Sequence, residues 1–107
     1  MVRQISVREL KQRLDRGEPT YLVDVRQAWE HEAAALPDHS LIPLDQLADR
    51  VDEVTPPPGA LVVTYCHHGI RSLNAAAILA QAGIEAVSLS GGIDLWSLQI
   101  DPGVPRY

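Results

Sequence analysis

The sequence is poor in several features that would place a protein in a common class. It contains one cysteine, Cys66, so no disulfide can form within the chain, which is typical of proteins of the reducing cytoplasm. No apolar run approaches the roughly 18 residues that a membrane-spanning helix requires. The N-terminal residues lack the apolar stretch of a signal peptide. We therefore expect a cytoplasmic protein that does not contact the membrane.

Composition also disfavours bound metals and nucleic acid. A single cysteine cannot build a cysteine-rich zinc site, and the four histidines are not at paired ligand spacings with it. The formal net charge of −5 at pH 7 opposes sequence-independent binding to nucleic acid and binding to an acidic membrane. We expect no metal, no cofactor and no nucleic-acid partner.

The residues that are present describe a soluble globular chain. It has 107 residues, of which 46% are hydrophobic and 21% are charged, unlike a disordered protein. This length is close to the commonest size of one domain and is sufficient to bury a core without disulfides or metals. We expect residues 1–107 to form a single domain, which excludes an enzyme with separate cofactor and substrate domains.

Helical and strand-like patterns alternate along the chain. Helices are expected over residues 6–16, 28–34, 44–51 and 72–82 and after Gly91-Gly92, and strands over residues 20–23, 41–42, 60–65 and 85–89. Ser6 and Glu9 give the first helix the S-x-x-E form of a capping box. The continuous apolar run over 60–65 is typical of a central parallel strand covered on both faces. The alternation predicts an α/β fold with a central parallel sheet.

The segment that follows the strongest strand carries the chemistry. Cys66 stands at the carboxyl end of this strand, where ligands of parallel sheets bind. A tight loop then opens directly into a helix, so unpaired backbone N–H groups and the positive helix end can converge on one point. Arg71 with His67 and His68 adds positive potential, and Gly69 permits a backbone that curls around a sulfur. This setting favours an anion, and it predicts that Cys66 is a nucleophilic thiolate.

Three interpretations of Cys66 are open. A lone cysteine in an apolar strand is often an inert buried thiol, but the glycine, arginine and helix start beside it argue against that interpretation. Cysteine-dependent phosphatases share a Cys-x5-Arg loop that binds a tetrahedral phosphate, whereas only four residues separate Cys66 from Arg71. The shorter ring suits one sulfur atom bonded to Cys66. The loop therefore indicates a sulfurtransferase, with a phosphate-ester or arsenate enzyme disfavoured.

Four sequence blocks in order resemble the rhodanese family. They are Cys66–Ser72, which matches C-x-x-G-x-R-[ST]; Asp24-Val25-Arg26 with Glu30, similar to D-V-R-x-x-x-E; Ile42-Pro43-Leu44; and Leu89–Ile93 with Trp96, similar to L-x-G-G-x-x-x-W. Together they extend from about Tyr21 to Pro105. Residues Ile100–Tyr107 also resemble the end of rhodanese domains that are fused to enzymes that activate ubiquitin-like proteins.

The resemblance implies a fold and a reaction. The fold is a five-stranded parallel sheet flanked by helices on both faces. A small anionic donor such as thiosulfate would load a persulfide on Cys66 and leave as sulfite, and cyanide, a thiol or a sulfur-carrier protein would remove the sulfur. The residues implied in donor binding are His67, His68, Gly69, Ile70, Arg71 and Ser72. Asp24 and Arg26 are implied as supports of the loop. An alternative is a sulfur-relay or sensing module that acts through a protein partner.

Several other polar and aromatic residues are expected to have structural roles. Asp24, Arg26 and Glu30 are expected to form a partly buried ion-pair network that holds the turn after their strand. Trp29 and Trp96 are expected in the core.

One segment departs from the family pattern. The family often has G-H-I-P-G-A where this chain reads Ala34–Ser40, so both glycines are absent. We expect this loss to alter the local loop geometry and to leave the chemistry intact. His31 and His39, in and near this segment, are expected to be ordinary surface residues.

Overall fold

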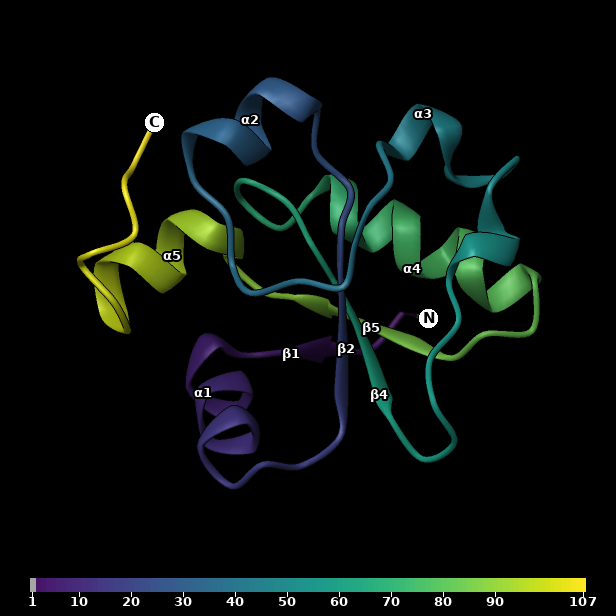
Figure 1. Ribbon diagram of the computed structural model, residues 1–107, viewed down its shortest axis with the longest axis horizontal. Coiled ribbons are helices and arrows are strands. Elements are labelled where there is room, and N and C mark those ends of the chain that lie inside the picture. Colours follow the sequence, from purple (N-terminus) through teal and green to yellow (C-terminus); the bar gives the residue numbers. More distant parts are fainter. Residues whose placement is uncertain (1) are drawn as a thin grey trace.

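The computed structural model describes residues 2–107 as a five-stranded parallel sheet with the strand order β1-β5-β4-β2-β3 (Figure 1). The strands are β1 (Gln4–Ile5), β2 (Thr20–Asp24), β3 (Ser40–Leu41), β4 (Leu61–Tyr65) and β5 (Ala86–Leu89). The helices are α1 (Val7–Asp15), α2 (Ala28–Ala33), α3 (Leu44–Leu47), α4 (Arg71–Gln81) and α5 (Gly92–Gln99), with a 3-10 turn at Val51–Glu53. The predicted α/β class and the five parallel strands are confirmed. Within the described residues, no helix is long and apolar enough to cross a membrane.

Helices cover both faces of the sheet, as predicted. Side chains of the central strand β4 alternate between the faces, with Val63 and Tyr65 on one and Val62 on the other. The first face packs on α1 and α5, through Val7, Leu10, Ile93 and Trp96. The second packs on α3 and α4, through Leu47, Ala75 and Leu79. In Figure 1, α1 lies on one side of the sheet, and α3 and α4 lie on the other. The α4-side core also includes Cys66.

The start of α1 follows the predicted capping box. The Ser6 hydroxyl accepts the Glu9 backbone N–H at 3.1 Å, and a Glu9 carboxylate oxygen accepts the Ser6 backbone N–H at 3.1 Å. These two bonds satisfy donors that have no partner inside the helix. Val7 and Leu10 are buried on the face that meets the sheet.

Two expectations from sequence differ from the structure, and one strand was missed. Residues 44–51 do not form one helix: after α3 the Arg50 backbone N–H bonds to the Leu47 carbonyl, a three-residue spacing that tightens the chain into a 3-10 turn. The two-residue strand β1 was not predicted, because it is defined only by its pairing with β5. Trp29 was expected in the core and is 63% exposed, whereas Trp96 is buried as expected.

Candidate active site

The loop between β4 and α4 closes around the Cys66 sulfur. Sγ accepts the Gly69 backbone N–H at 3.1 Å and the Ser72 backbone N–H at 3.4 Å. The Ser72 hydroxyl lies 3.5 Å from Sγ and is held by the Ser88 hydroxyl at 2.7 Å. Cys66 is 1% exposed. The convergence of N–H groups that the sequence predicted is therefore present in the structure, with two donors on one sulfur.

The start of α5 holds the outer side of this loop. The Ile93 backbone N–H donates to the Cys66 carbonyl at 2.9 Å, and the Asp94 N–H donates to the His67 carbonyl at 3.1 Å. These two bonds satisfy loop carbonyls, and the Gly69 and Ser72 N–H groups of the same loop donate to the sulfur. Gly92 has φ +63°, and a Cβ there would overlap both carbonyl oxygens. Only glycine fits at this contact, which explains the second residue of the Gly91-Gly92 pair.

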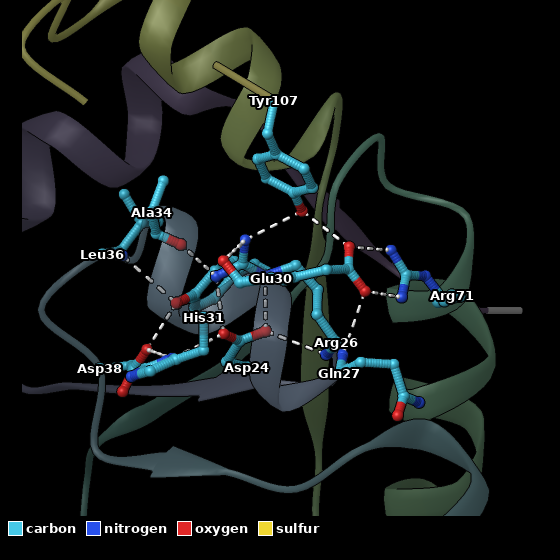
Figure 2. A network of polar contacts seen from close by, with 11 residues as sticks. Asp24, Arg26, Gln27, Glu30, His31, Ala34, Leu36, Asp38, Arg71 and Tyr107 are labelled. Carbon is cyan, nitrogen blue, oxygen red and sulfur yellow. Dashed lines mark hydrogen bonds and ion pairs between the residues drawn. The ribbon is translucent and has the colours of Figure 1, made fainter. Parts of the chain in front are cut away.

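Arg71 leaves the first turn of α4 and forms a two-point ion pair with Glu30 of α2. Arg71 Nη1 lies 2.7 Å from Glu30 Oε1, and Nη2 lies 2.8 Å from Oε2 (Figure 2). The Gln27 backbone N–H and the Tyr107 hydroxyl also donate to this carboxylate. The Arg71 bonds, with smaller contributions from Tyr107 and Gln27, outweigh burial and lower the Glu30 pKa to about 2.

The pair places a positive charge close to the sulfur. The pKa of Arg71 is raised, chiefly by its bonds to Glu30 and also by electrostatic attraction to Cys66. The Arg71 side chain is 35% exposed, so one side of it remains open to solvent. The pair uses Nη1 and Nη2 and leaves the Nε–H group of Arg71 outside it. Arg71 therefore stands at the rim of the loop.

Arg26 is the centre of a buried network beneath this rim. Its guanidinium bonds both carboxylate oxygens of Asp24, at 2.9 and 2.7 Å, and the Ala34 carbonyl at 2.7 Å. Burial opposes the charge, but the bonds to Asp24 and to the Tyr107 hydroxyl raise the Arg26 pKa. Neither Asp24 nor Arg26 bonds the cysteine loop itself. Arg26 bonds the Tyr107 hydroxyl, which in turn donates to Glu30, the partner of Arg71. The predicted ion pair of Asp24 and Arg26 is confirmed, whereas the Glu30 carboxylate pairs with Arg71 and is linked to Arg26 through the Tyr107 hydroxyl.

The other predicted loop residues divide into two groups. The His67 ring lies between the His68 ring, with centroids 3.9 Å apart, and the Tyr107 ring, 4.0 Å away and nearly parallel to it. Burial and the neighbouring His68 lower the His67 pKa, which favours the neutral form of this ring. The side chains of His68 and Ile70 are exposed at the rim. Gly69 and Ser72 contact the sulfur, whereas His67, His68 and Ile70 form the surroundings of the loop.

Asp24, His31 and Asp38 also come together, with one ligand atom from each within 4.8 Å of the others. Both Asp24 oxygens are bonded to the Arg26 guanidinium, whose positive charge opposes a cation at this point. The set does not fit a metal ion. His31 was expected to be an ordinary surface residue, but its Nδ1 lies 2.9 Å from Asp24. His39 is exposed, as expected, and its ring stacks on Tyr21 with ring centroids 4.8 Å apart.

The Glu30 carboxylate predicts a pH-dependent contribution to stability. Its pKa in the folded protein, about 2, is lower than the ordinary value of 4.5. The charged form therefore stabilises the fold above pH 4.5, and this stabilisation is lost as the pH falls toward 2. We expect Glu30→Gln to reduce the free energy of unfolding by about 2–3 kcal/mol at pH 7 and by much less near pH 2.5, measured by urea unfolding.

The matched control for this measurement is Glu53→Gln. Glu53 pairs with Arg50 on the surface, where both side chains are largely solvated. We expect its effect to be small at both pH values. A Glu30→Gln effect that stays constant from pH 7 to pH 2.5 would contradict the charged pair as its source.

Three comparisons with known proteins point to the same family. The family model described as Rhodanese-like domain matches residues 6–99. The chain is 38% identical over 98 residues to a sulfurtransferase of Allochromatium vinosum, covering 91% of this chain and 90% of that protein. Among solved structures, a rhodanese-like domain protein from Staphylococcus aureus superposes with a TM-score of 0.82 at 29% identity, covering 99% of both chains.

Larger relatives contain the same unit. The chain is 35% identical over 104 residues to the probable adenylyltransferase/sulfurtransferase MoeZ of Mycobacterium tuberculosis. The match covers 96% of this chain and 26% of MoeZ, so the chain spans about a quarter of that relative's length. The resemblance inferred from the four sequence blocks is confirmed by these similarities.

Proposed function

Because this chain belongs to the rhodanese-like family of sulfurtransferases, we propose that it carries a sulfane sulfur as a persulfide on Cys66, between an anionic donor and a thiophilic acceptor. The observation that supports this proposal most directly is the pair of backbone N–H groups, of Gly69 and Ser72, on the Cys66 sulfur. Donors aimed at a sulfur stabilise its negative charge in a site that excludes water.

The proposed reaction with thiosulfate has two steps. The Cys66 thiolate attacks the outer sulfur of thiosulfate, the sulfur–sulfur bond of the donor breaks, and sulfite leaves with the electron pair. An acceptor such as cyanide then attacks the terminal sulfur of the persulfide, and Cys66 leaves as a thiolate. Both steps develop or move negative charge at the loop, where the N–H groups and the rim charge of Arg71 favour it.

The geometry favours sulfur transfer over hydrolysis of a phosphate ester. Two loop N–H groups, of Gly69 and Ser72, are directed at the buried Cys66 sulfur, and only four residues lie between Cys66 and Arg71. The two terminal nitrogens of Arg71 are bonded to Glu30 and are not arranged as a free fork for phosphate oxygens. We therefore favour the sulfurtransferase interpretation, as the four-residue spacing of the loop already indicated.

A mass measurement tests the proposal directly. After incubation with thiosulfate and removal of the excess, we expect the intact protein to gain the mass of one sulfur atom. Addition of cyanide is expected to remove this mass and to release thiocyanate. An unchanged mass together with no thiocyanate would contradict the proposal. Because the chain has a single cysteine, the adduct can be assigned to Cys66 without peptide mapping.

A protein acceptor is the second candidate, and the rim of the site favours it. Trp29 is 63% exposed beside Glu30, and Ile70 is 72% exposed beside Arg71. Exposed apolar side chains next to a reactive group are typical of a docking site for a protein. If the function is sulfur relay in the cytoplasm, the loaded protein will transfer its sulfur to a purified sulfur-carrier protein faster than to cyanide or a small thiol. Faster discharge to the small acceptors would contradict this candidate.

The role of Arg71 leads to a further prediction. We expect Arg71→Ala to raise the thiosulfate KM about tenfold with a smaller change in kcat, because a charge-assisted contact at the rim contributes roughly 1.5 kcal/mol to donor binding. Steady-state thiocyanate formation measures both constants.

The single variant also leaves the Glu30 carboxylate unpaired, which would repel an anionic donor. Arg71→Ala combined with Glu30→Gln removes that repulsion and serves as the control. A KM that returns to the wild-type value in the double variant would show that the donor does not use the Arg71 charge.

A further inference from the structure

Tyr107 connects a distant part of the chain to the rim of the site. Its hydroxyl donates to Glu30 Oε2 at 2.7 Å and accepts a hydrogen bond from Arg26 Nη1 at 2.9 Å (Figure 2). Its ring stacks on His67 of the cysteine loop and meets the edge of the Trp29 ring, with centroids 5.8 Å apart. Tyr107 therefore contacts the connection between β2 and α2 at Arg26, the helix α2 at Trp29 and Glu30, and the cysteine loop at His67.

The hydroxyl completes the set of donors around the Glu30 carboxylate. Oε1 accepts the Gln27 backbone N–H at 3.1 Å and Arg71 Nη1 at 2.7 Å. Oε2 accepts Arg71 Nη2 at 2.8 Å and the Tyr107 hydroxyl at 2.7 Å. With two donors on each oxygen, the plane of the carboxylate is fixed. Because Arg71 binds both oxygens, the plane of the carboxylate also sets the direction of the guanidinium.

Arg26 makes the hydroxyl a stronger donor. The buried guanidinium gives a hydrogen bond to the Tyr107 oxygen, which polarises the O–H bond toward Glu30. Burial, together with the bond to Glu30, raises the Tyr107 pKa to about 12, so the hydroxyl keeps its proton at neutral pH. A continuous chain of charge-assisted bonds thus runs from Asp24 through Arg26, Tyr107 and Glu30 to Arg71.

We propose that Tyr107 is a positioning residue that fixes the Glu30–Arg71 pair and thereby orients the rim charge that meets an anionic sulfur donor. The proposal rests on the sulfur-transfer function proposed above. Tyr107 does not contact Cys66 in this arrangement and acts through Glu30 and Arg71. The ring of Tyr107 packs against His67 and Trp29, and its hydroxyl positions the Glu30 carboxylate. Tyr107→Phe separates these two contributions, because it keeps the ring.

The first test is kinetic. We expect Tyr107→Phe to raise the thiosulfate KM about three- to tenfold, with kcat changed less than about twofold. The expected rise is smaller than the full contribution of a hydrogen bond to a charged group, because Tyr107 acts on the donor only through Glu30 and Arg71. In an Arg71→Ala background the same change is expected to have no further effect on KM. Tyr21→Phe is the matched control. The Tyr21 hydroxyl bonds Ser40 and the Thr55 backbone N–H, away from the cysteine loop. The thiosulfate KM of this variant is expected to equal that of the wild type.

The second test does not require turnover. In a Cys66→Ser background, which binds the donor without reacting, the dissociation constant of thiosulfate is measured by NMR titration with and without Tyr107→Phe. We expect Tyr107→Phe to weaken binding by the same factor as it raises KM. If the wild type forms no persulfide while this binding difference persists, the proposed function fails and the positioning role stands. An unchanged dissociation constant, no thiosulfate binding at the loop, or an equal KM rise in the Arg71→Ala background would overturn the positioning role.

Discussion

Replacement of Cys66 by serine is expected to reduce sulfur loading and thiocyanate formation to the background level. The serine hydroxyl is close in size to the thiol and can accept the same Gly69 and Ser72 N–H groups, so the loop is expected to keep its shape. An alcohol does not ionise at neutral pH and cannot form a persulfide, so the nucleophile and the carrier are lost together. Intact-mass measurement after thiosulfate treatment and a thiocyanate assay measure the two losses.

The cysteine prediction needs a control for folding. Cys66 is buried in the α4-side core, so a polar replacement there can lower stability as well as activity. Circular dichroism and the thermal midpoint of Cys66→Ser show whether the fold is retained. Thiosulfate protection against unfolding in this variant would show that the loop still binds the donor. Turnover by folded Cys66→Ser at the wild-type rate would place the chemistry at another residue.

Loss of the Arg26 guanidinium is expected to produce the largest destabilisation. Arg26→Met removes all bonds from this side chain and leaves the Asp24 carboxylate buried with no guanidinium partner; both side chains are fully buried. Removing one member of a buried ion pair costs about 3–5 kcal/mol, because the remaining charge has lost its partner and cannot reach water. Urea unfolding at pH 7 measures this cost.

Two variants give this prediction its controls. Arg50→Met breaks the surface pair with Glu53 and is expected to change the free energy of unfolding only slightly, because solvent screens exposed ion pairs. Asp24→Asn combined with Arg26→Met removes the unpaired charge and is expected to be more stable than Arg26→Met alone. A loss for Arg26→Met no greater than that for Arg50→Met would contradict the buried charge as the source of the effect.

Local patterns in the sequence were sufficient to predict much of the fold. The Ser6–Glu9 capping box, the apolar run over 60–65 and the alternation of helix and strand each depend on residues a few positions apart. The position of Cys66 between the end of a strand and the start of a helix also follows from residues only a few positions apart. Its consequence, N–H groups of Gly69 and Ser72 on the sulfur, was therefore predictable.

Features that depend on distant neighbours were not predictable in the same way. β1 exists as a strand only because it pairs with β5, and α3 ends early where the chain tightens to carry Leu47 and Val54 into the same core. Trp29 has the large apolar side chain that is typical of a core residue, but its position on α2 leaves it exposed. The periodicities of strands and helices in the sequence did not reveal the strand β1, the early end of α3 or the exposure of Trp29.

The parallel α/β class, the loop that surrounds Cys66 and the pairing of Asp24 with Arg26 at the end of β2 were predictable from residues close together in the sequence. The pairing of Arg71 with Glu30, 41 positions away, and the hydrogen bond from Tyr107 to Glu30, 77 positions away, became visible only in the folded chain. Short-range spacing fixes backbone conformation, because a turn or cap involves only neighbouring residues. The partner of a charged side chain is fixed by which strand and helix ends meet, which requires the sheet order and the packing of α2, α4 and the segment after α5 at one edge of the sheet.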